Sequence, residues 1–149
     1  MELIIRDAVP EDSKALAVLN RKEMGYDYPE KQQREKLERL LADGRNRILV
    51  AQRGAEVVGY VHLCDYDVLY APHMKNIMGI AVSSSCRRMG IGKALLEAAE
   101  VWARETGAAG IRLSSGETRK GAHAFYRSLM YEGEKMQLNL KKMFQEWSK

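Results

Sequence analysis

The residues best suited to chemistry lie in one segment, 77–96, where a run of branched apolar residues passes through a short loop into a helical pattern. Two glycines, Gly90 and Gly92, stand where that helix begins. Because glycine leaves the backbone uncovered, unpaired N–H groups and the positive end of the helix dipole can face a phosphate group directly. Arg87, Arg88 and Lys93 add positive charge at the same place. This combination predicts a site for a phosphorylated ligand.

Two common phosphate-binding motifs fit this segment poorly. A nucleoside-triphosphate loop needs Gly-Lys followed by Ser or Thr to bind magnesium, and here Ala94 follows Gly92-Lys93. A dinucleotide-binding loop needs a third glycine or an alanine where Leu95 stands, and it normally follows the first strand of its unit. Both motifs are therefore disfavoured, and the remaining structural interpretation is a flexible entry to a helix.

The same segment resembles the signature of the GNAT superfamily of acetyltransferases, which is Arg or Gln, two residues, Gly, one residue, then Gly or Ala. Arg87, Gly90 and Gly92 match it. The resemblance covers essentially the whole chain, because the strand before the motif, the helix and strand after it, and the helix with Phe125-Tyr126 follow in the family's order. It implies an α/β (α+β) fold with a mixed, largely antiparallel sheet of six to seven strands and about four helices.

The resemblance also implies that the sheet splays open between the strands at 76–82 and 111–114. Acetyl-coenzyme A, the acyl donor, would bind in this V-shaped slot, with its pantetheine amides paired to strand backbone and its diphosphate at the helix start. A backbone N–H near Val82 is placed to polarise the thioester carbonyl. No metal is implied. The residues predicted to contact the coenzyme are Ile80, Ala81, Val82, Arg87, Arg88, Met89, Gly90, Ile91, Gly92, Lys93 and Arg119.

Tyr126 takes the position of a family tyrosine that faces the coenzyme sulfur. A phenol can protonate the departing thiolate, whose conjugate acid has a pKa of about 8.5, so the transfer is nearly balanced. We therefore predict Tyr126 as the general acid; the other interpretation is a core tyrosine packed beside Phe125. Two nearby positions depart from the family. Arg119 replaces a common asparagine and either reaches a phosphate or points to water, and Met130 replaces a glycine suited to a left-handed turn.

The general base is not identified by residue type and spacing. A protonated amine has no lone pair, so a proton must be removed, and His73, Glu117 and His123 are the candidates. We predict His73, because it lies in a loop just before the 76–82 strand and histidine is the side-chain type best suited to accept a proton near neutral pH. Proton removal through ordered water is the alternative.

Around this segment, apolar patterns predict alternating strands and helices. Branched apolar runs or alternation indicate strands, whereas helical spacing, as in Leu95 and Trp102, indicates helices. Gly107 is placed to end the helix after the motif. The expected strands are 3–9, 47–52, 57–63, 76–82, 111–114 and 135–143, and the expected helices are 10–24, 30–41, 91–106 and 120–129.

Length and composition predict a single folded domain over residues 1–149, with 46% apolar and 30% charged residues. The net charge of +4 is too small to indicate a nucleic-acid partner, and no apolar run is long enough to cross a membrane. Cys64 and Cys86 form no metal-binding or disulfide pattern, and the N-terminal residues lack a secretory signal. We therefore expect a cytoplasmic protein.

The leading functional prediction is an N-acetyltransferase that acts on a primary amine of a small molecule or peptide, by direct attack in a ternary complex. The alternative is a regulatory module that binds acyl-coenzyme A without turning it over. The acceptor is not identified, and we expect its site in segments 25–29 and 65–75, whose tyrosines either line a pocket or are half-buried surface residues. An apolar edge suited to a homodimer, unless it is buried within the chain, is formed by Leu138, Leu140, Phe144 and Trp147.

Overall fold

A computed structural model describes residues 2–116, 119–133 and 135–147. Contacts within the chain divide it into two compact units, residues 1–113 and 114–149, and each is described by itself. The first unit holds the sheet and the helices packed on it, and the second unit holds the last helix. In the part of the chain that is described, no helix is both long enough and apolar enough to cross a membrane.

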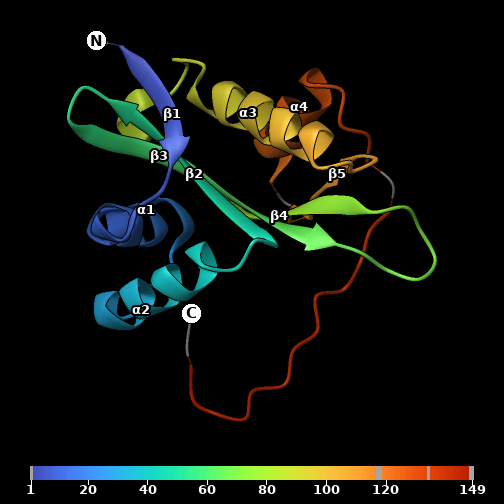
Figure 1. Ribbon diagram of the computed structural model, residues 1–149, viewed down its shortest axis with the longest axis horizontal. Coiled ribbons are helices and arrows are strands. Elements are labelled where there is room, and N and C mark those ends of the chain that lie inside the picture. The colour runs from blue at the N-terminus through green and yellow to red at the C-terminus, as the bar shows by residue number, and fades with distance from the viewer. Residues whose placement is uncertain (1, 117–118, 134, 148–149) are drawn as a thin grey trace. The chain divides into compact units, whose positions relative to one another are not determined.

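A five-stranded sheet forms the centre of the first unit (Figure 1). The strands lie in chain order, with β1 to β4 antiparallel and β5 parallel to β4. The predicted mixed, largely antiparallel sheet is confirmed, but the expected six to seven strands are wrong, because the described residues form five. The strands are β1 (Leu3–Asp7), β2 (Asn46–Arg53), β3 (Glu56–Tyr66), β4 (Met74–Val82) and β5 (Ile111–Arg112). The helices of this unit are α1 (Ser13–Met24), α2 (Glu30–Leu41) and α3 (Ile91–Glu105), with 3-10 turns at Pro10–Asp12 and Ser84–Cys86.

Helices cover both faces of the sheet (Figure 1). On one face, α1 and α2 bury Leu16, Leu19 and Leu37 against a cluster that includes Tyr60 of β3. The preceding residue, Gly59, points to the opposite face, as alternation along a strand requires. A Cβ at Gly59 would lie 3.2 Å from Ile91 and 3.3 Å from Leu95, so the missing side chain lets α3 approach the sheet closely.

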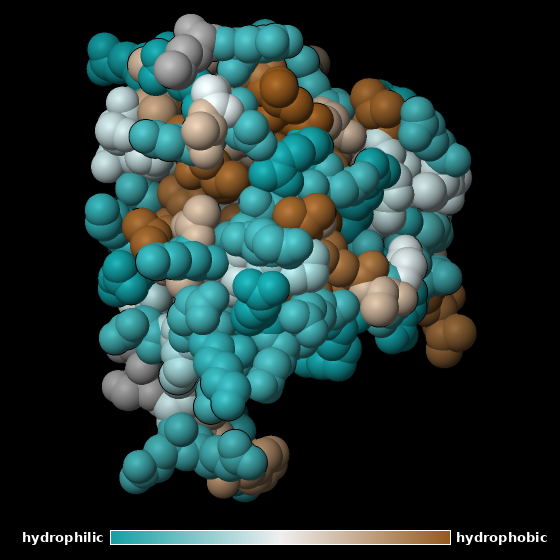
Figure 2. Space-filling model, turned by 60° about the vertical axis from the view of Figure 1, so that its left-hand side comes forward, coloured by the Kyte–Doolittle hydropathy of each residue, from teal (hydrophilic) through white to brown (hydrophobic). Residues whose placement is uncertain are grey.

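The helix ends agree with the chemistry of their residues. Gly25 ends α1 with φ of 75°, and Gly107 follows α3 with φ of 80°, both in the left-handed region that glycine adopts easily. In α2 the only buried residue is Leu37, and nine of the other eleven positions are charged or polar. Accordingly, the molecular face toward which α1 and α2 lie is mostly hydrophilic, with smaller apolar groups (Figure 2).

The second unit contains helix α4 (Lys120–Ser128), which confirms the helix predicted there. The strand predicted at 135–143 is wrong, because the described residues of this range form no strand. Its alternating apolar side chains are exposed, with Met136 at 71%, Leu138 at 86% and Leu140 at 82%. Alternation favours a strand only where a neighbouring strand supplies hydrogen bonds and a buried face, and the described part of this unit contains none.

Candidate active site

The sheet opens between β4 and β5. The two strands pair at only two positions, Lys75 with Ile111 and Asn76 with Arg112. Beyond Asn76, β4 continues to Val82 with β3 on one side and, among the described residues, no strand on the other. The predicted splay of the sheet is confirmed, and the closed end of the slot lies at Asn76 and Arg112.

A β-bulge interrupts β4 just beyond the closed end of the slot. In the neighbouring strand, His62 pairs with Gly79 and the next residue, Leu63, pairs with Ile77, so Met78 has no residue opposite it. Bulges bend a strand and change which groups face each side. The strand pattern at 76–82 did not predict this bulge, although an isolated glycine inside a strand, here Gly79, is the signal that could have indicated it.

The bulge turns two backbone N–H groups toward the slot. N–H groups normally alternate between the two sides of a strand. The N–H of Lys75 points to the β5 side, 3.0 Å from the carbonyl oxygen just before β5, whereas that of Ser83 points to β3, 2.8 Å from its acceptor. The two positions differ by eight, so in a regular strand both N–H groups would point to the same side, and the one-residue shift at Met78 explains why they do not. Counting back from Ser83, the N–H groups of Val82 and Ile80 face the slot.

The loop between β4 and α3 presents free backbone N–H groups. Residues 87–88 form a turn, and the first bond into α3 runs from Ala94 to the carbonyl oxygen of Gly90 at 3.0 Å, so among the described residues the N–H groups of residues 90–93 have no protein acceptor. Arg88 and Gly90 have φ of 65° and 75°, which turns the exposed loop into the helix start. The geometry therefore fits an anion at the N-terminus of α3.

Side chains around this loop make it positively charged. Arg87 and Arg88 are exposed and form no ion pair among the described residues, and Lys93 lies 3.9 Å from a glutamate one turn further along α3. Both members of that last pair are exposed, so the pairing is weak. Glu23 at the end of α1 accepts the N–H of Ser84 at 3.0 Å, which ties α1 to the start of the loop.

A polar cluster lies at the closed end of the slot, on the face covered by α1 and α2. The Nζ of Lys75 lies 4.2 Å from the ring centre of Trp102 in α3, so the next residue, Asn76, points to the opposite face. Arg112 donates from Nη1 to Asn76 Oδ1 at 2.6 Å, and its guanidinium lies 4.2 Å from the ring centre of Tyr66. The sequence did not single out Asn76 or Arg112, because isolated polar residues on two strands form no motif.

His73 lies beyond the closed end, away from the open part of the slot. Its Nε2 is 3.4 Å from Asp65 Oδ1, which also binds Lys75 Nζ at 2.5 Å. Burial raises the pKa of Asp65, but the hydrogen bonds and charges of Lys75 and His73 lower it more, so the net pKa is below the usual value. His73 lies three residues before Asn76, which corresponds to about 10 Å along an extended chain. Glu117, the acidic candidate for the base, lies outside the described residues.

Tyr126 belongs to the second unit and is buried there. It is 8% exposed, and its ring centre lies 5.4 Å from that of Phe125 and 6.0 Å from that of Tyr131. Burial raises the pKa of the phenol, with a smaller opposing effect from the charge of Arg119. The phenol is therefore protonated at neutral pH, as a general acid must be. Its position at the coenzyme sulfur stays a prediction.

The other candidates of the second unit lie at the two ends of α4. Arg119 is exposed and donates its N–H to Gly116 at 3.0 Å, and its contact with a phosphate stays a prediction. His123 Nε2 lies 2.8 Å from the carbonyl oxygen of the same glycine. Met130 has φ of 72°, and the following N–H, that of Tyr131, bonds back to α4 at 3.0 Å. Met130 therefore adopts the left-handed backbone that glycine adopts more easily at this position in the family.

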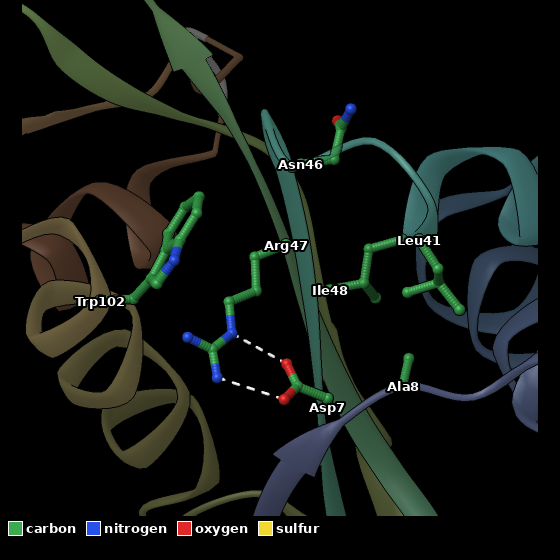
Figure 3. A pocket seen from close by; sticks show the side chains of 8 residues that line it. Asp7, Ala8, Leu41, Asn46, Arg47, Ile48 and Trp102 are labelled. Carbon is green, nitrogen blue, oxygen red and sulfur yellow. Dashed lines mark hydrogen bonds and ion pairs between the residues drawn. The ribbon is translucent and has the colours of Figure 1, made fainter. Parts of the chain in front are cut away.

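A separate pocket of about 350 Å³ lies in the first unit near the start of β2 (Figure 3). Arg47 reaches across it to Asp7, with Nε to Oδ1 at 2.8 Å and Nη2 to Oδ2 at 3.2 Å. Trp102 stands beside this pair, 5.9 Å from the guanidinium. Because its charges already neutralise each other, this pocket is a weaker candidate than the slot. It is lined by Asp7, Ala8, Leu41, Gly44, Asn46, Arg47, Ile48 and Trp102.

Residues 13–130 match the model of the acetyltransferase (GNAT) family, a range that includes the slot, the loop and α4. The chain belongs to the GNAT acetyltransferase family. Over 54 residues this GNAT chain is also 44% identical to YhdJ, an uncharacterized N-acetyltransferase of Bacillus subtilis (strain 168). That match covers 36% of the chain and 38% of YhdJ, so it spans well under half of that relative.

Solved structures share the fold of this GNAT chain. A transcriptional regulator from Bacillus halodurans C-125 superposes with a TM-score of 0.85 at 23% identity, covering 95% of this chain and 100% of that one. AAC(6′)-Iy, in complex with the bisubstrate analogue CoA-S-monomethyl-acetylneamine, gives 0.85 at 16% identity, covering 96% and 99%. An aminoglycoside 6′-N-acetyltransferase from Acinetobacter haemolyticus gives 0.80 at 20% identity, covering 95% and 99%. At these identities the likeness shows the fold alone.

Proposed function

We propose that this GNAT protein is an N-acetyltransferase that moves an acetyl group from acetyl-coenzyme A to a primary amine of a small molecule or peptide. The observation that carries the proposal is an open strand edge that leads directly into a loop of free N–H groups. The neighbours support it, since AAC(6′)-Iy was solved both with a bisubstrate analogue and with coenzyme A.

The first unit offers two kinds of backbone contact to the coenzyme. The N–H group of Val82 would pair with a pantetheine amide, as an added strand would. The N–H groups of residues 88–93 and the positive end of α3 would bind the diphosphate, with Arg87 adding charge. Arg119 of the second unit would add a phosphate contact.

Acetyl transfer requires the amine nitrogen to bond to the thioester carbon while the C–S bond breaks. The N–H of Ile80, next to the bulge, would polarise the carbonyl oxygen as it gains negative charge. Tyr126 would give its proton to the leaving thiolate. The amine must also lose a proton. His73 is our candidate base, and because it lies beyond the closed end of the slot, we propose that the proton travels through ordered water.

We further propose that both units form one acetyltransferase domain over residues 1–149, because the family match crosses the boundary between them. A cytoplasmic location fits the two free cysteines. A homodimer fits the apolar edge near the C-terminus, where Leu138, Leu140 and Phe144 are exposed by 86%, 82% and 88%. Light scattering on the intact chain tests the dimer.

A second candidate, a regulatory module that binds acyl-coenzyme A without turnover, is favoured by the fold likeness to the Bacillus halodurans transcriptional regulator. A thiol-release assay with acetyl-coenzyme A separates the two, with polyamines, amino acids, aminoglycosides and peptide N-termini as acceptors. Turnover of any amine supports the enzyme. Tight coenzyme binding by calorimetry without turnover of any amine supports the regulatory module.

A further inference from the structure

Arg112 lies where the slot closes, opposite Asn76 of β4. When the loop at 88–93 holds the diphosphate, the thioester end of the coenzyme points down the slot, because β4 leads from that loop back to Asn76. The strand from Asn76 to Val82 spans roughly 20 Å. An amine that attacks the thioester therefore works near the closed end, within reach of a long side chain at position 112.

The acceptor must approach this point from the face covered by α1 and α2. On the other face α3 fills the closed end, since Lys75 is 2% exposed and its Nζ lies over the ring of Trp102. On the α1 and α2 face, Gly79 beside the bulge leaves room. A Cβ there would lie 3.4 Å from the hydroxyl of Tyr60. Arg112 lies on this same face.

The guanidinium of Arg112 is held in place but retains unused donors. Its Nη1 donates to Asn76 at 2.6 Å, its plane lies over Tyr66, and the Tyr66 hydroxyl is 3.4 Å from that of Tyr70. Among the described residues, its Nε and Nη2 have no acceptor and no carboxylate pairs with it. These two N–H groups form one edge of the guanidinium, with the spacing that matches two carboxylate or phosphate oxygens.

The carboxylate near the end of β3, that of Asp65, does not neutralise the Arg112 guanidinium. Asp65 is engaged by Lys75 at 2.5 Å and by His73 at 3.4 Å, on the α3 face of the sheet. It is therefore also unavailable to a cationic acceptor on the opposite face. Among the residues that the structure describes, the closed end of the slot therefore presents a positive charge without a matching negative one.

We propose that Arg112 determines acceptor specificity by binding a carboxylate or phosphate group of the acceptor, so that amines with an anionic group are preferred over polycations such as aminoglycosides. This inference rests on the proposed acetyl transfer at the slot. From Ile80 to Asn76 the strand covers about 13 Å, less the shortening at the bulge. Because the guanidinium is bound at Asn76, at the closed end of that distance, several bonds separate the amine from the anionic group in a preferred acceptor.

Amines of equal length test the proposal. Thiol release from acetyl-coenzyme A is measured with 6-aminohexanoate, hexylamine and 1,6-diaminohexane, and with an aminoalkyl phosphate to separate phosphate from carboxylate. The variants are Arg112→Gln, which keeps a donor for Asn76 but lacks the charge, and Arg112→Lys, which keeps the charge but lacks the fork. Arg47→Gln is the matched control, because Arg47 also lies over an aromatic ring but on the α3 face, paired with Asp7.

We expect the wild type to use 6-aminohexanoate or the aminoalkyl phosphate with kcat/KM about tenfold or more above that for hexylamine, and 1,6-diaminohexane least of all. Arg112→Gln should lose that preference through KM, with coenzyme affinity unchanged by calorimetry, and Arg112→Lys should keep part of it. Arg47→Gln should keep all of it. Equal use of the amines by the wild type, or a preference that survives in Arg112→Gln, overturns the role of Arg112 and leaves acetyl transfer standing. No thiol release with any amine overturns both.

Discussion

The two sides of the slot are built from different chemistry. The side that we propose for the coenzyme presents backbone groups, the N–H groups of Ile80, Val82 and the 88–93 loop. The side that we propose for the acceptor presents side chains from separate strands, with Arg112 bound to Asn76. Recognition by backbone groups needs glycine and a free strand edge, so a short segment of sequence is enough to specify it. Side-chain recognition can be changed by one substitution while the slot is preserved.

The largest expected effect concerns the chemical step that both sides serve. Tyr126→Phe removes the proton that we assign to the leaving thiolate, so kcat should fall by roughly 10²–10³-fold while the KM values for coenzyme and amine change little. Burial raises the pKa of Tyr126, so the wild-type rate should not fall from its ionisation at neutral pH. Steady-state kinetics across pH check both points.

Tyr131→Phe is the control, because its ring lies 6.0 Å from that of Tyr126 and shares its environment. It should retain nearly full kcat. An unchanged kcat in Tyr126→Phe, with an acceptor known to turn over, would remove Tyr126 from the mechanism and leave it as a packed core residue.

The next largest effect is a loss of coenzyme affinity alone. Gly90→Val places a branched side chain at φ of 75°, where left-handed backbone costs an L-residue about 1–2 kcal/mol, and covers the N–H groups of the loop. Affinity for acetyl-coenzyme A should fall about tenfold or more by calorimetry. Gly107→Val bears the same strain at φ of 80° beyond the other end of α3, with open space around it. It should lose stability but keep its coenzyme affinity, and equal losses in the two variants would contradict a local role for the loop.

The contrast also explains what the sequence could predict. The start of α3 was predicted correctly from Gly90 and Gly92, and the helix itself followed from the spacing of Leu95 and Trp102. That the loop before it binds the coenzyme stays a prediction. The splay came only from the family resemblance, since nothing in residues 76–82 says that a neighbouring strand is missing.

The rest depends on contacts between distant segments. The bulge at Met78 is a property of how β3 and β4 pair, and the bond from Arg112 to Asn76 joins strands far apart in the sequence. The strand expected at 135–143 had the right alternation but no strand partner among the described residues. Periodicity records which face of a segment is apolar and not whether another segment covers it.

A smaller effect concerns the start of α1, one of the two helices that pack on the proposed acceptor face of the sheet. Asp12 at the start of α1 accepts from Arg6 at 2.8 and 2.9 Å and from the N–H of Val9 at 2.8 Å. The Arg6 hydrogen bonds lower the pKa of Asp12 despite the opposing effect of burial. A lowered pKa stabilises the fold above the unfolded value of about 3.9, and the gain is lost as pH falls through the folded value.

Asp12→Asn should therefore reduce the free energy of unfolding by about 1–3 kcal/mol at pH 7, and the difference from wild type should shrink below about pH 4. Urea unfolding at several pH values measures this. Asp43→Asn is the control, because Arg45 lowers the pKa of Asp43 to about 2 in an exposed pair that contributes little to stability. A difference for Asp12→Asn that does not vary with pH would refute the assigned ion pair.

The smallest expected effect concerns backbone strain at two residues with positive φ, one in the proposed coenzyme loop and one outside it. Met130 and Arg88 both have positive φ, at 72° and 65°. Met130→Gly and Arg88→Gly should each raise the free energy of unfolding by up to about 1 kcal/mol, since glycine adopts this backbone without a steric cost. Only Arg88→Gly should weaken coenzyme binding, because it removes a charge from the loop. Thermal unfolding and calorimetry on both variants check this, and weakened binding in Met130→Gly alone would reverse the distinction.

The most direct test of a backbone grip on the coenzyme is amide NMR during titration with acetyl-coenzyme A. We predict large shifts, together with slowed hydrogen exchange, for the N–H groups of Ile80, Val82 and residues 88–93, and small changes for Tyr66 and Arg112. Saturating coenzyme that leaves the 88–93 amides unshifted and freely exchanging would contradict the account.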